Sequence, residues 1–326
     1  MNRRCFLATL LAATGCQSLE KARGPSIQTV LGPIPASDFG FALTHEHLMC
    51  DFIGAEKTGR HRWNVDEVVR TMRPHLEALR KIGVTGFVDC TPAYIGRDPR
   101  VLKQLAIDTG LHIVTNTGYY GGANDKFVPK HAYTETEEQL AARWVAEWKH
   151  GIEDTGVKPG FMKIGVDEAK NGQLSEIDAK LVRASALASA ETNLAVVCHT
   201  GGASGGLAAA KLFSGPKRKF IVAHSDGHGL DTNKQVADLG AWVSFDAISR
   251  KPLETHLKLV QAMIEHHSDH LLLSHDNGWY AVGEAQKIRG FTYLPETFLP
   301  ALKNAGLAEH VIRKLTVDNP AAAFGT

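Results

Sequence analysis

The segment Leu43-Thr44-His45-Glu46-His47-Leu48 ends a short apolar run that begins at Phe41. Side chains two residues apart on a β-strand point to the same face, so His45 and His47 are expected to lie side by side. Two imidazoles in this arrangement can bind one metal ion. A His-x-His pair alone is a weak signal, because such pairs also arise by chance. A metal site therefore requires further ligands from the rest of the chain.

The composition describes a globular protein with balanced charge. The chain has 326 residues, of which 44% are hydrophobic, and this is enough for one large core. The 36 Lys and Arg residues match the 35 Asp and Glu residues, so we expect no nucleic-acid partner. Several of the 16 histidines follow apolar runs, a distribution that favours metal binding over pH sensing.

The N-terminal residues have the features of an export signal. Arg3 and Arg4 precede an apolar stretch, 5–13, that is too short to span a bilayer. Residues 3–7 resemble a twin-arginine signal, and residues 11–16 resemble a lipobox in which Cys16 would be lipidated. An ordinary secretory signal is the alternative. We predict a signal over 1–16, a tether over 17–26 and an exported, periplasmic or outer-surface lipoprotein held to a membrane only through its lipid anchor.

From residue 27 onward, apolar strand-like runs alternate with segments whose apolar residues recur at helical spacing. A short strand, 27–31, and a turn at Gly32-Pro33-Ile34-Pro35 come first. The predicted strands are 41–48, 84–90, 112–117, 160–166, 194–199, 219–224, 241–246 and 270–276. The predicted helices between them are 64–82, 99–109, 135–154, 176–192, 205–213, 230–239 and 253–267, with terminal helices after the last strand.

Eight strand–helix units predict a closed (β/α)8 barrel, the TIM-barrel member of the α/β class. Strands that are apolar on both faces, joined by amphipathic helices, form a parallel sheet covered on both sides. A doubly wound open sheet is the competing fold, but no Gly-rich phosphate-binding turn follows any strand. No linker-like stretch interrupts the mature chain, so we predict a single domain over 27–326.

Candidate metal ligands stand on five of the predicted strands, at the face where such barrels place their active sites. Each has a structural alternative, such as a core histidine, His228 in place of His224, or a helix cap at Asp276. Together they exceed one tetrahedral shell and favour two divalent ions, most simply zinc. The candidates are His45, His47, Lys163, His199, His224 and Asp276.

These residues resemble the phosphotriesterase family of the amidohydrolase superfamily, with its phosphotriesterase-like lactonases, from about residue 29 to residue 324. The matching segments are Thr29-Val30-Leu31-Gly32-Pro33, 43–48, Gly160-Phe161-Met162-Lys163, Cys198-His199-Thr200, Ala223-His224-Ser225-Asp226, Leu273-Ser274-His275-Asp276 and 316–321.

The resemblance implies a binuclear centre in which carbon dioxide converts Lys163 to a bridging carbamate, N6-carboxylysine. This would remove the cost of burying an unpaired ammonium in an apolar strand. His45, His47 and Asp276 would bind the more buried ion, and His199 and His224 the more exposed one. Such ions lower the pKa of a shared water, which gives a bridging hydroxide, and Asp276 would pass its proton towards the leaving group.

Two positions depart from the family pattern. The strand 7 aspartate, Asp246, is followed by Ala247, where characterised triesterases and acyl-homoserine lactonases have His or Arg, and Gly227 stands where triesterases have an acidic relay residue. The candidate pocket residues are Tyr120, Trp279 and Arg289, the last for an anionic or hydroxylated substrate.

We therefore expect an enzyme that hydrolyses small-molecule lactones or related esters. Phosphotriester or phosphodiester hydrolysis at the same centre is the nearest alternative. A non-catalytic, metal-binding surface lipoprotein is the alternative of another class, which Lys163 and Asp276 disfavour, because a binding protein needs neither a carbamate nor a proton shuttle. The sequence leaves a homodimer open.

Overall fold

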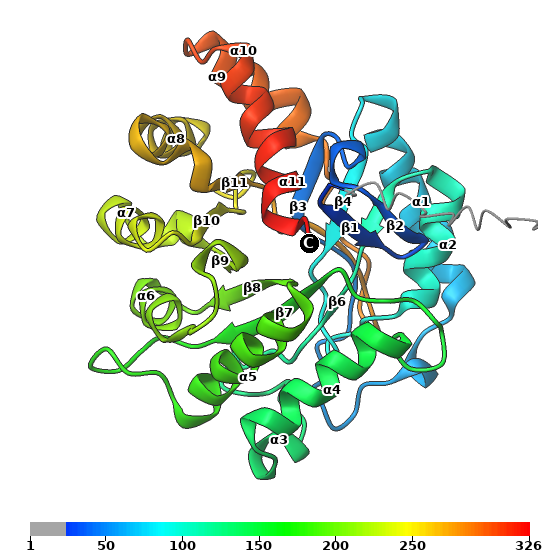
Figure 1. Ribbon diagram of the computed structural model, residues 1–326. Coiled ribbons are helices and arrows are strands. Elements are labelled where there is room, and N and C mark those ends of the chain that lie inside the picture. Colours follow the sequence, from blue (N-terminus) through cyan, green and yellow to red (C-terminus); the bar gives the residue numbers. More distant parts are fainter. Residues whose placement is uncertain (1–23) are drawn as a thin grey trace, which may run out of the picture.

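The computed structural model describes residues 24–326, in which eight parallel strands form a barrel with helices around it (Figure 1). The predicted signal, Cys16 and most of the predicted tether lie outside these residues. The barrel strands are β3 (Ala42–Cys50), β4 (Gly86–Asp89), β5 (His112–Val114) continued by β6 (Asn116–Thr117), β7 (Phe161–Val166), β8 (Ala195–Thr200), β9 (Phe220–Val222), β10 (Trp242–Phe245) and β11 (Leu271–Leu273).

The helices follow the strands in alternation and form the outer ring. They are α1 (Val65–Lys81), α2 (Pro99–Thr109), α3 (His131–Thr134), α4 (Glu137–His150), α5 (Glu176–Thr192), α6 (Ala203–Leu212), α7 (Leu230–Asp238), α8 (Leu253–His267), α9 (Leu299–Asn304), α10 (Glu309–Arg313) and α11 (Asn319–Phe324). Single turns of 3-10 helix are η1 (Ala36–Asp38), η2 (Arg60–Arg62), η3 (Lys217–Lys219), η4 (Ser225–Gly227) and η5 (Ser268–His270), and π-helical turns are η6 (Leu294–Phe298) and η7 (Lys314–Asp318).

Parallel hydrogen bonding runs through β6, β7, β8, β9, β10 and β11 in that order, and through β5, β4 and β3. The chain itself joins β5 to β6, and β3 and β11 close the ring. The Asp276 amide donates to the His45 carbonyl oxygen at 2.9 Å, and the His45 amide donates to Ser274 Oγ at 2.9 Å. A further strand, β12 (Gly278–Ala281), continues the pairing with β3 from Gly278 opposite His47. The last strand is thus tied to the first beside the His45-x-His47 pair.

Successive side chains along each barrel strand point alternately into the barrel and out towards the helices. The apolar ones therefore form an inner cluster and an outer cluster. On β8, Ala195 and Val197 belong to the inner cluster, whereas Val196 and Cys198 belong to the outer one. His199 continues the inward series. Lys163 is two residues beyond Phe161 on β7, also a member of the inner cluster, and so points inward in the same way. Strand periodicity therefore directs both side chains into the barrel.

If β3 were regular, it would point His45 and His47 away from the barrel interior. Ala42 belongs to the inner cluster and Leu43 to the outer one, so strict alternation would turn His45 away from the barrel interior. The register between β3 and β4 shifts between Leu43 and Glu46. A bulge of this kind reverses the phase of the strand and directs His45 and His47 inward.

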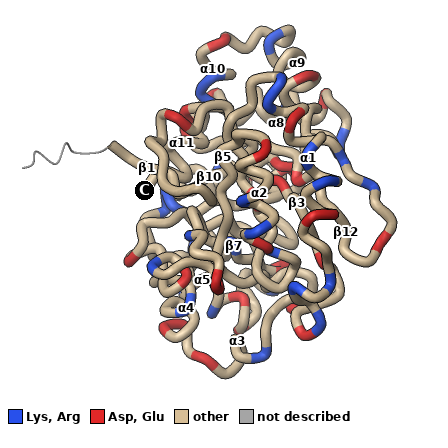
Figure 2. The backbone as a smooth tube through the Cα atoms, turned by 90° about the vertical axis from the view of Figure 1, so that its right-hand side faces the viewer, with Lys and Arg blue, Asp and Glu red and all other residues tan. Residues whose placement is uncertain are grey.

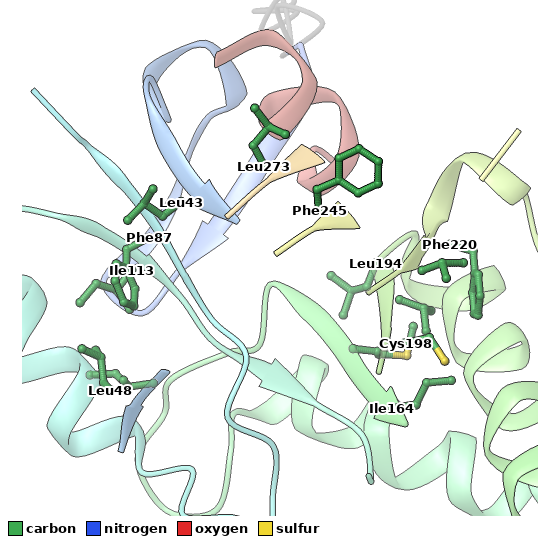
Figure 3. Close-up of a cluster of buried hydrophobic side chains, with 14 of the residues drawn as sticks. Leu43, Leu48, Phe87, Ile113, Ile164, Leu194, Cys198, Phe220, Phe245 and Leu273 are labelled. Carbon is green, nitrogen blue, oxygen red and sulfur yellow. The ribbon is translucent and has the colours of Figure 1, made fainter. Parts of the chain in front are cut away.

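The outer cluster packs the strands against the helices. Leu43, Phe87 and Ile113 stand opposite one another on β3, β4 and β5, and Figure 3 shows their side chains together. Charged residues of both signs are interspersed along the chain, in keeping with the formal net charge of +1 (Figure 2). No helix in residues 24–326 has the length and apolar character needed to cross a membrane.

The barrel and its single-domain organisation are confirmed. One local prediction is wrong. Gly32–Pro35 is not a turn but strand β2, which pairs antiparallel with β1 (Ser26–Thr29), and the chain reverses at Val30 and Leu31. Proline is tolerated in β2 because this strand lies at the edge of a two-stranded sheet, where a missing N–H costs no ladder bond.

Candidate metal centre

His45, His47 and Asp276 meet where the first and last barrel strands run side by side. His47 Nε2 lies 2.9 Å from Asp276 Oδ1, and His45 Nε2 lies 3.9 Å from the same oxygen. One potential ligand atom from each residue lies within 4.8 Å of the other two, a spacing that suits one metal ion. Only 1% of His45 is exposed, whereas the side chains of His47 and Asp276 are 12% and 14% exposed.

His199 and His224 form a second group beside the first. His199 Nδ1 and His224 Nε2 are 2.6 Å apart, and the His224 ring lies 5.1 Å from the His45 ring between centroids. Lys163, which is 1% exposed, places Nζ 3.1 Å from His45 Nε2. All six predicted ligand residues thus line one cavity. Their role as ligands stays a prediction.

Asp246, directly after β10, orients histidines from both groups. It is fully buried, and its carboxylate lies 2.7 Å from His45 Nδ1 and 2.8 Å from His224 Nδ1. Thr91 Oγ1 lies 2.8 Å from His47 Nδ1 in the same way. With Nδ1 occupied, each of these imidazoles presents Nε2 to the cavity, the usual support for a metal-binding histidine. Asp246 is also close enough to be a ligand itself, but its contacts with the two Nδ1 atoms favour the supporting role.

The protonation states of His45, His199 and Asp276 suit metal binding, whereas at His224 the Asp246 carboxylate outweighs the effect of burial and raises the pKa. Burial, reinforced by the charge of Lys163, lowers the pKa of His45 to about 4. Burial and the neighbouring His224 hold the pKa of His199 well below its ordinary value. Burial would raise the pKa of Asp276, but the hydrogen bond and charge of His47 outweigh it and lower that pKa. Neutral imidazoles and ionised carboxylates are the forms that bind cations.

The backbone conformation favours a functional role for His224 and Asp276 over the structural alternatives. His224 and Asp276 have φ values of 59° and 52°, in the left-handed region that non-glycine residues occupy at a cost of about 1–3 kcal/mol and that recurs at functional sites. His228 instead places Nε2 3.0 Å from Thr200 Oγ1, away from the cluster. Asp276 precedes strand β12 and so does not cap a helix.

The cavity above these groups has a volume of about 480 Å³. Tyr120 lines it and lies 4.7 Å from the His199 ring, between centroids. Trp279 lines it too, and the Arg289 guanidinium lies over the Trp279 ring at 4.5 Å. Tyr120 and Trp279 thus line the cavity, whereas Arg289 lies over Trp279 and is not among the lining residues. The other walls are mostly apolar and include Cys50, Phe52, Pro92, Ile95, Phe127 and Ala247.

The chain is similar to proteins of known family. The sequence pattern of the Phosphotriesterase family matches residues 25–324. The chain belongs to the phosphotriesterase family. It is 29% identical to the phosphotriesterase homology protein of Escherichia coli, over 87% of this chain and 98% of that protein. It is 28% identical to the aryldialkylphosphatase of Saccharolobus solfataricus, over 89% of this chain and 96% of the relative.

Among solved structures, a variant of the organophosphorus hydrolase from Deinococcus radiodurans superposes with a TM-score of 0.83. The two sequences are 25% identical, and the match covers 93% of this chain and 99% of the other. The predicted family and the (β/α)8 fold are therefore both confirmed.

The two departures from the phosphotriesterase-family pattern lie at the cavity. Ala247 and Gly227 both line it, and a side chain at Gly227 would extend into open space. A guanidinium nevertheless reaches this region from Arg250, three residues after Ala247. Arg250 Nη2 lies 2.6 Å from Asp276 Oδ2, the oxygen that faces away from His47.

Three site residues were missed by the sequence analysis. The position of Asp246 at the end of a predicted strand could have indicated a site residue, but the sequence does not show that it contacts two histidines. Glu46 faces away from the two histidines that flank it and accepts bonds from the segment around Asp276. Arg250 lies in an irregular loop, and no local pattern marks its contact with Asp276.

Replacing Asp246 with asparagine is expected to weaken metal binding about 10–100-fold, the usual effect of losing a carboxylate that supports metal-binding histidines. The amide offers one acceptor oxygen where two imidazole N–H groups now donate. Competition with a chromogenic chelator measures the affinity. Asp238→Asn, at a side chain that is 67% exposed, is the matched control. Equal affinities for the Asp246 variant and the control would contradict the supporting role.

Proposed function

We propose that this phosphotriesterase-family protein is a binuclear metal-dependent hydrolase that cleaves lactones or related carboxylic esters. The observation that carries the proposal is the position of Lys163. Its Nζ is buried, and within residues 24–326 no carboxylate oxygen lies within 4.0 Å of it, while His45 Nε2 lies 3.1 Å away. An unpaired ammonium in such a place is costly.

Carboxylation of Lys163 by carbon dioxide would resolve this cost. The carbamate is an anion with two oxygens, so it could bind one ion beside His45, His47 and Asp276 and another beside His199 and His224. The donor set of imidazoles and carboxylates suits zinc or a similar divalent ion. When bound, two such ions would supply an activated water at neutral pH and would polarise the substrate oxygen.

Side chains around the centre would then transfer the proton, position Asp276 and orient the substrate. Asp276, which stays ionised at neutral pH because His47 and His45 outweigh the effect of burial on its pKa, would accept the proton of the attacking water and pass it towards the leaving group. Arg250 would hold Asp276 Oδ2, so that Oδ1 faces the centre. The apolar walls around Phe52, Phe127 and Trp279 would exclude bulk water and orient the substrate.

Hydrolysis of phosphotriesters at the same centre is the second candidate. It is favoured by the similarity to an enzyme named aryldialkylphosphatase, which covers 96% of that relative. The absence of a side chain at Gly227, where characterised triesterases have an acidic relay residue, favours esters and lactones instead. The absence of a basic side chain at Ala247 does not separate the two candidates, because characterised triesterases and acyl-homoserine lactonases both have His or Arg there.

Metal analysis combined with a substrate screen tests the proposal. The purified domain is expected to contain about two divalent ions per chain. It should hydrolyse lactones faster than aryl phosphotriesters and lose activity when a chelator removes the metal. About one ion or none per chain would contradict the binuclear centre, and faster turnover of phosphotriesters would favour the second candidate. Binding of the metal without hydrolysis of either class would support the non-catalytic alternative.

A further inference from the structure

Two arginines converge beside Asp276. Arg250 lies in the loop after β10 and lines the cavity, whereas Arg289 follows β12 and lies over Trp279, which lines the cavity. Arg250 Nη2 lies 2.6 Å from Asp276 Oδ2 and also donates to the Asp276 carbonyl oxygen. Arg289 Nη2 donates to the same carbonyl oxygen at 3.3 Å. Two guanidinium groups that share one acceptor atom lie close enough to repel each other.

The protein does not balance the charge of Arg289. In the described part of the chain, no carboxylate oxygen lies within 4.0 Å of its guanidinium, which stacks on the Trp279 ring at 4.5 Å. Burial and the charge of Arg250 lower its pKa, but a guanidinium remains protonated in proteins. Arg289 is therefore a half-buried cation without an anionic partner.

The acidic residues of the cavity are already engaged. Asp276 has one oxygen 2.9 Å from His47 Nε2 and the other 2.6 Å from Arg250 Nη2. Asp226 lies 2.6 Å from His256 Nε2 and accepts the Asp246 amide at 2.9 Å. Lys251, which also lines the cavity, adds another positive charge on this side. This edge of the cavity therefore has more cations than free carboxylates.

Another part of the cavity wall is apolar. Phe52, Ile95 and Phe127 line it, and the rings of Phe52 and Phe127 lie 6.4 Å apart between centroids. The Phe52 ring also lies 5.7 Å from Trp279. The predicted metal ligands thus lie below a cavity with one apolar side and one cationic edge, a combination that suits a ligand with an apolar part and an anionic group.

We propose that Arg250 and Arg289 form an anion subsite and that the substrate bears an oxyanion group, a carboxylate, sulfonate or phosphate, near the bond that is cleaved. Guanidinium groups bind such oxyanions through charge-assisted, often bidentate hydrogen bonds. The apolar part of the substrate would lie against Phe52 and Phe127. The nature of the cleaved bond rests on the proposed function, whereas the binding of the anion does not.

Matched lactones test the subsite in the metal-loaded enzyme. The probes are γ-butyrolactone γ-carboxylate and its neutral methylamide, with sulfonate and phosphate analogues to rank the oxyanions. The carboxylate is expected to have about a tenfold higher kcat/KM than the methylamide, as one charge-assisted hydrogen bond would give. Arg289→Met and Arg250→Met should each remove most of this preference, and Arg289→Lys should restore part of it.

Arg313→Met, at an exposed side chain on α10, is the control and should keep the wild-type ratio between the two probes. No preference in the wild-type enzyme, or the wild-type ratio in both arginine variants, would overturn the proposal. Metal content is measured for every variant, so that a lost metal is not mistaken for a lost anion contact.

Binding of a ketone analogue separates the subsite from the proposed function. Cyclopentanone carboxylate and its methylamide cannot be hydrolysed, so calorimetric titration of the metal-loaded protein reports binding alone. We expect the carboxylate to bind about tenfold more weakly to Arg289→Met than to wild type, with no such difference for the methylamide. If no lactone is hydrolysed, the proposed function fails, but this comparison still decides the anion subsite. Equal carboxylate affinities for the two proteins would overturn it.

Discussion

Replacing Asp276 with asparagine is expected to lower kcat/KM for ester hydrolysis about 10³-fold. Burial would raise the pKa of this carboxyl, but His47 and His45 outweigh it, so the group stays ionised at neutral pH and is free to accept a proton. An amide of the same shape cannot do so. Its oxygen could still face His47, but its NH2 group would then replace the oxygen that now accepts from Arg250. Steady-state kinetics with the best lactone of the screen measures the loss.

In Asp276→Asn, the metal content distinguishes the loss of a proton acceptor from the loss of a metal ligand. If Asp276→Asn retains the wild-type metal content and is still inactive, the proton-transfer role is supported. Inactivity with one ion lost per chain would assign the effect to metal binding. Asp269→Asn, at a side chain that is 73% exposed, is the matched control and should retain wild-type activity. Wild-type activity in Asp276→Asn would eliminate this residue as the proton shuttle.

Replacing Glu46 with alanine is expected to lower the free energy of unfolding by roughly 3–5 kcal/mol, because several buried donors would lose their acceptor at about 1–3 kcal/mol each. Glu46 is fully buried and accepts hydrogen bonds from Ser274 Oγ at 2.8 Å, the His275 amide at 3.0 Å and the Asn277 amide at 2.9 Å. Alanine would leave these donors buried and unpaired, next to a cavity. Guanidinium denaturation measures the change.

The same substitution is expected to disturb the metal centre, because Asp276 lies between two residues that Glu46 holds. His275 Nδ1 lies 2.7 Å from Glu46 Oε1, and His275 Nε2 accepts the Leu294 amide at 2.7 Å, so Glu46 also connects β3 to η6. Glu46→Gln keeps the shape and one acceptor oxygen and should cost less than Glu46→Ala. Glu77→Ala, at an exposed position of α1, should change stability by less than about 0.5 kcal/mol. If Glu46→Ala lowered the free energy of unfolding as little as Glu77→Ala does, the role of Glu46 as a buried acceptor would be contradicted.

The sequence by itself determined the barrel and the positions of the candidate ligands along it. Strand and helix periodicities are local, and the C-terminal ends of parallel strands meet at one face. Lys163, His199 and His224 could therefore be placed together before their distances were known. Their spacing within that face could not be predicted, because it depends on strand tilt and on closure between β3 and β11.

Only the tertiary structure decided how the site is supported. A bulge between Leu43 and Glu46 turns His45 and His47 inward, although the strand before it has the opposite phase. Asp246 is separated from His45 by 201 residues and Arg250 from Asp276 by 26, and each pair is in contact. Such contacts depend on how distant loops pack over the barrel, and no period or motif within one segment encodes them. The His45-x-His47 pair was thus visible in the sequence, whereas the direction in which it points and the residues that hold it there were set by the closed barrel.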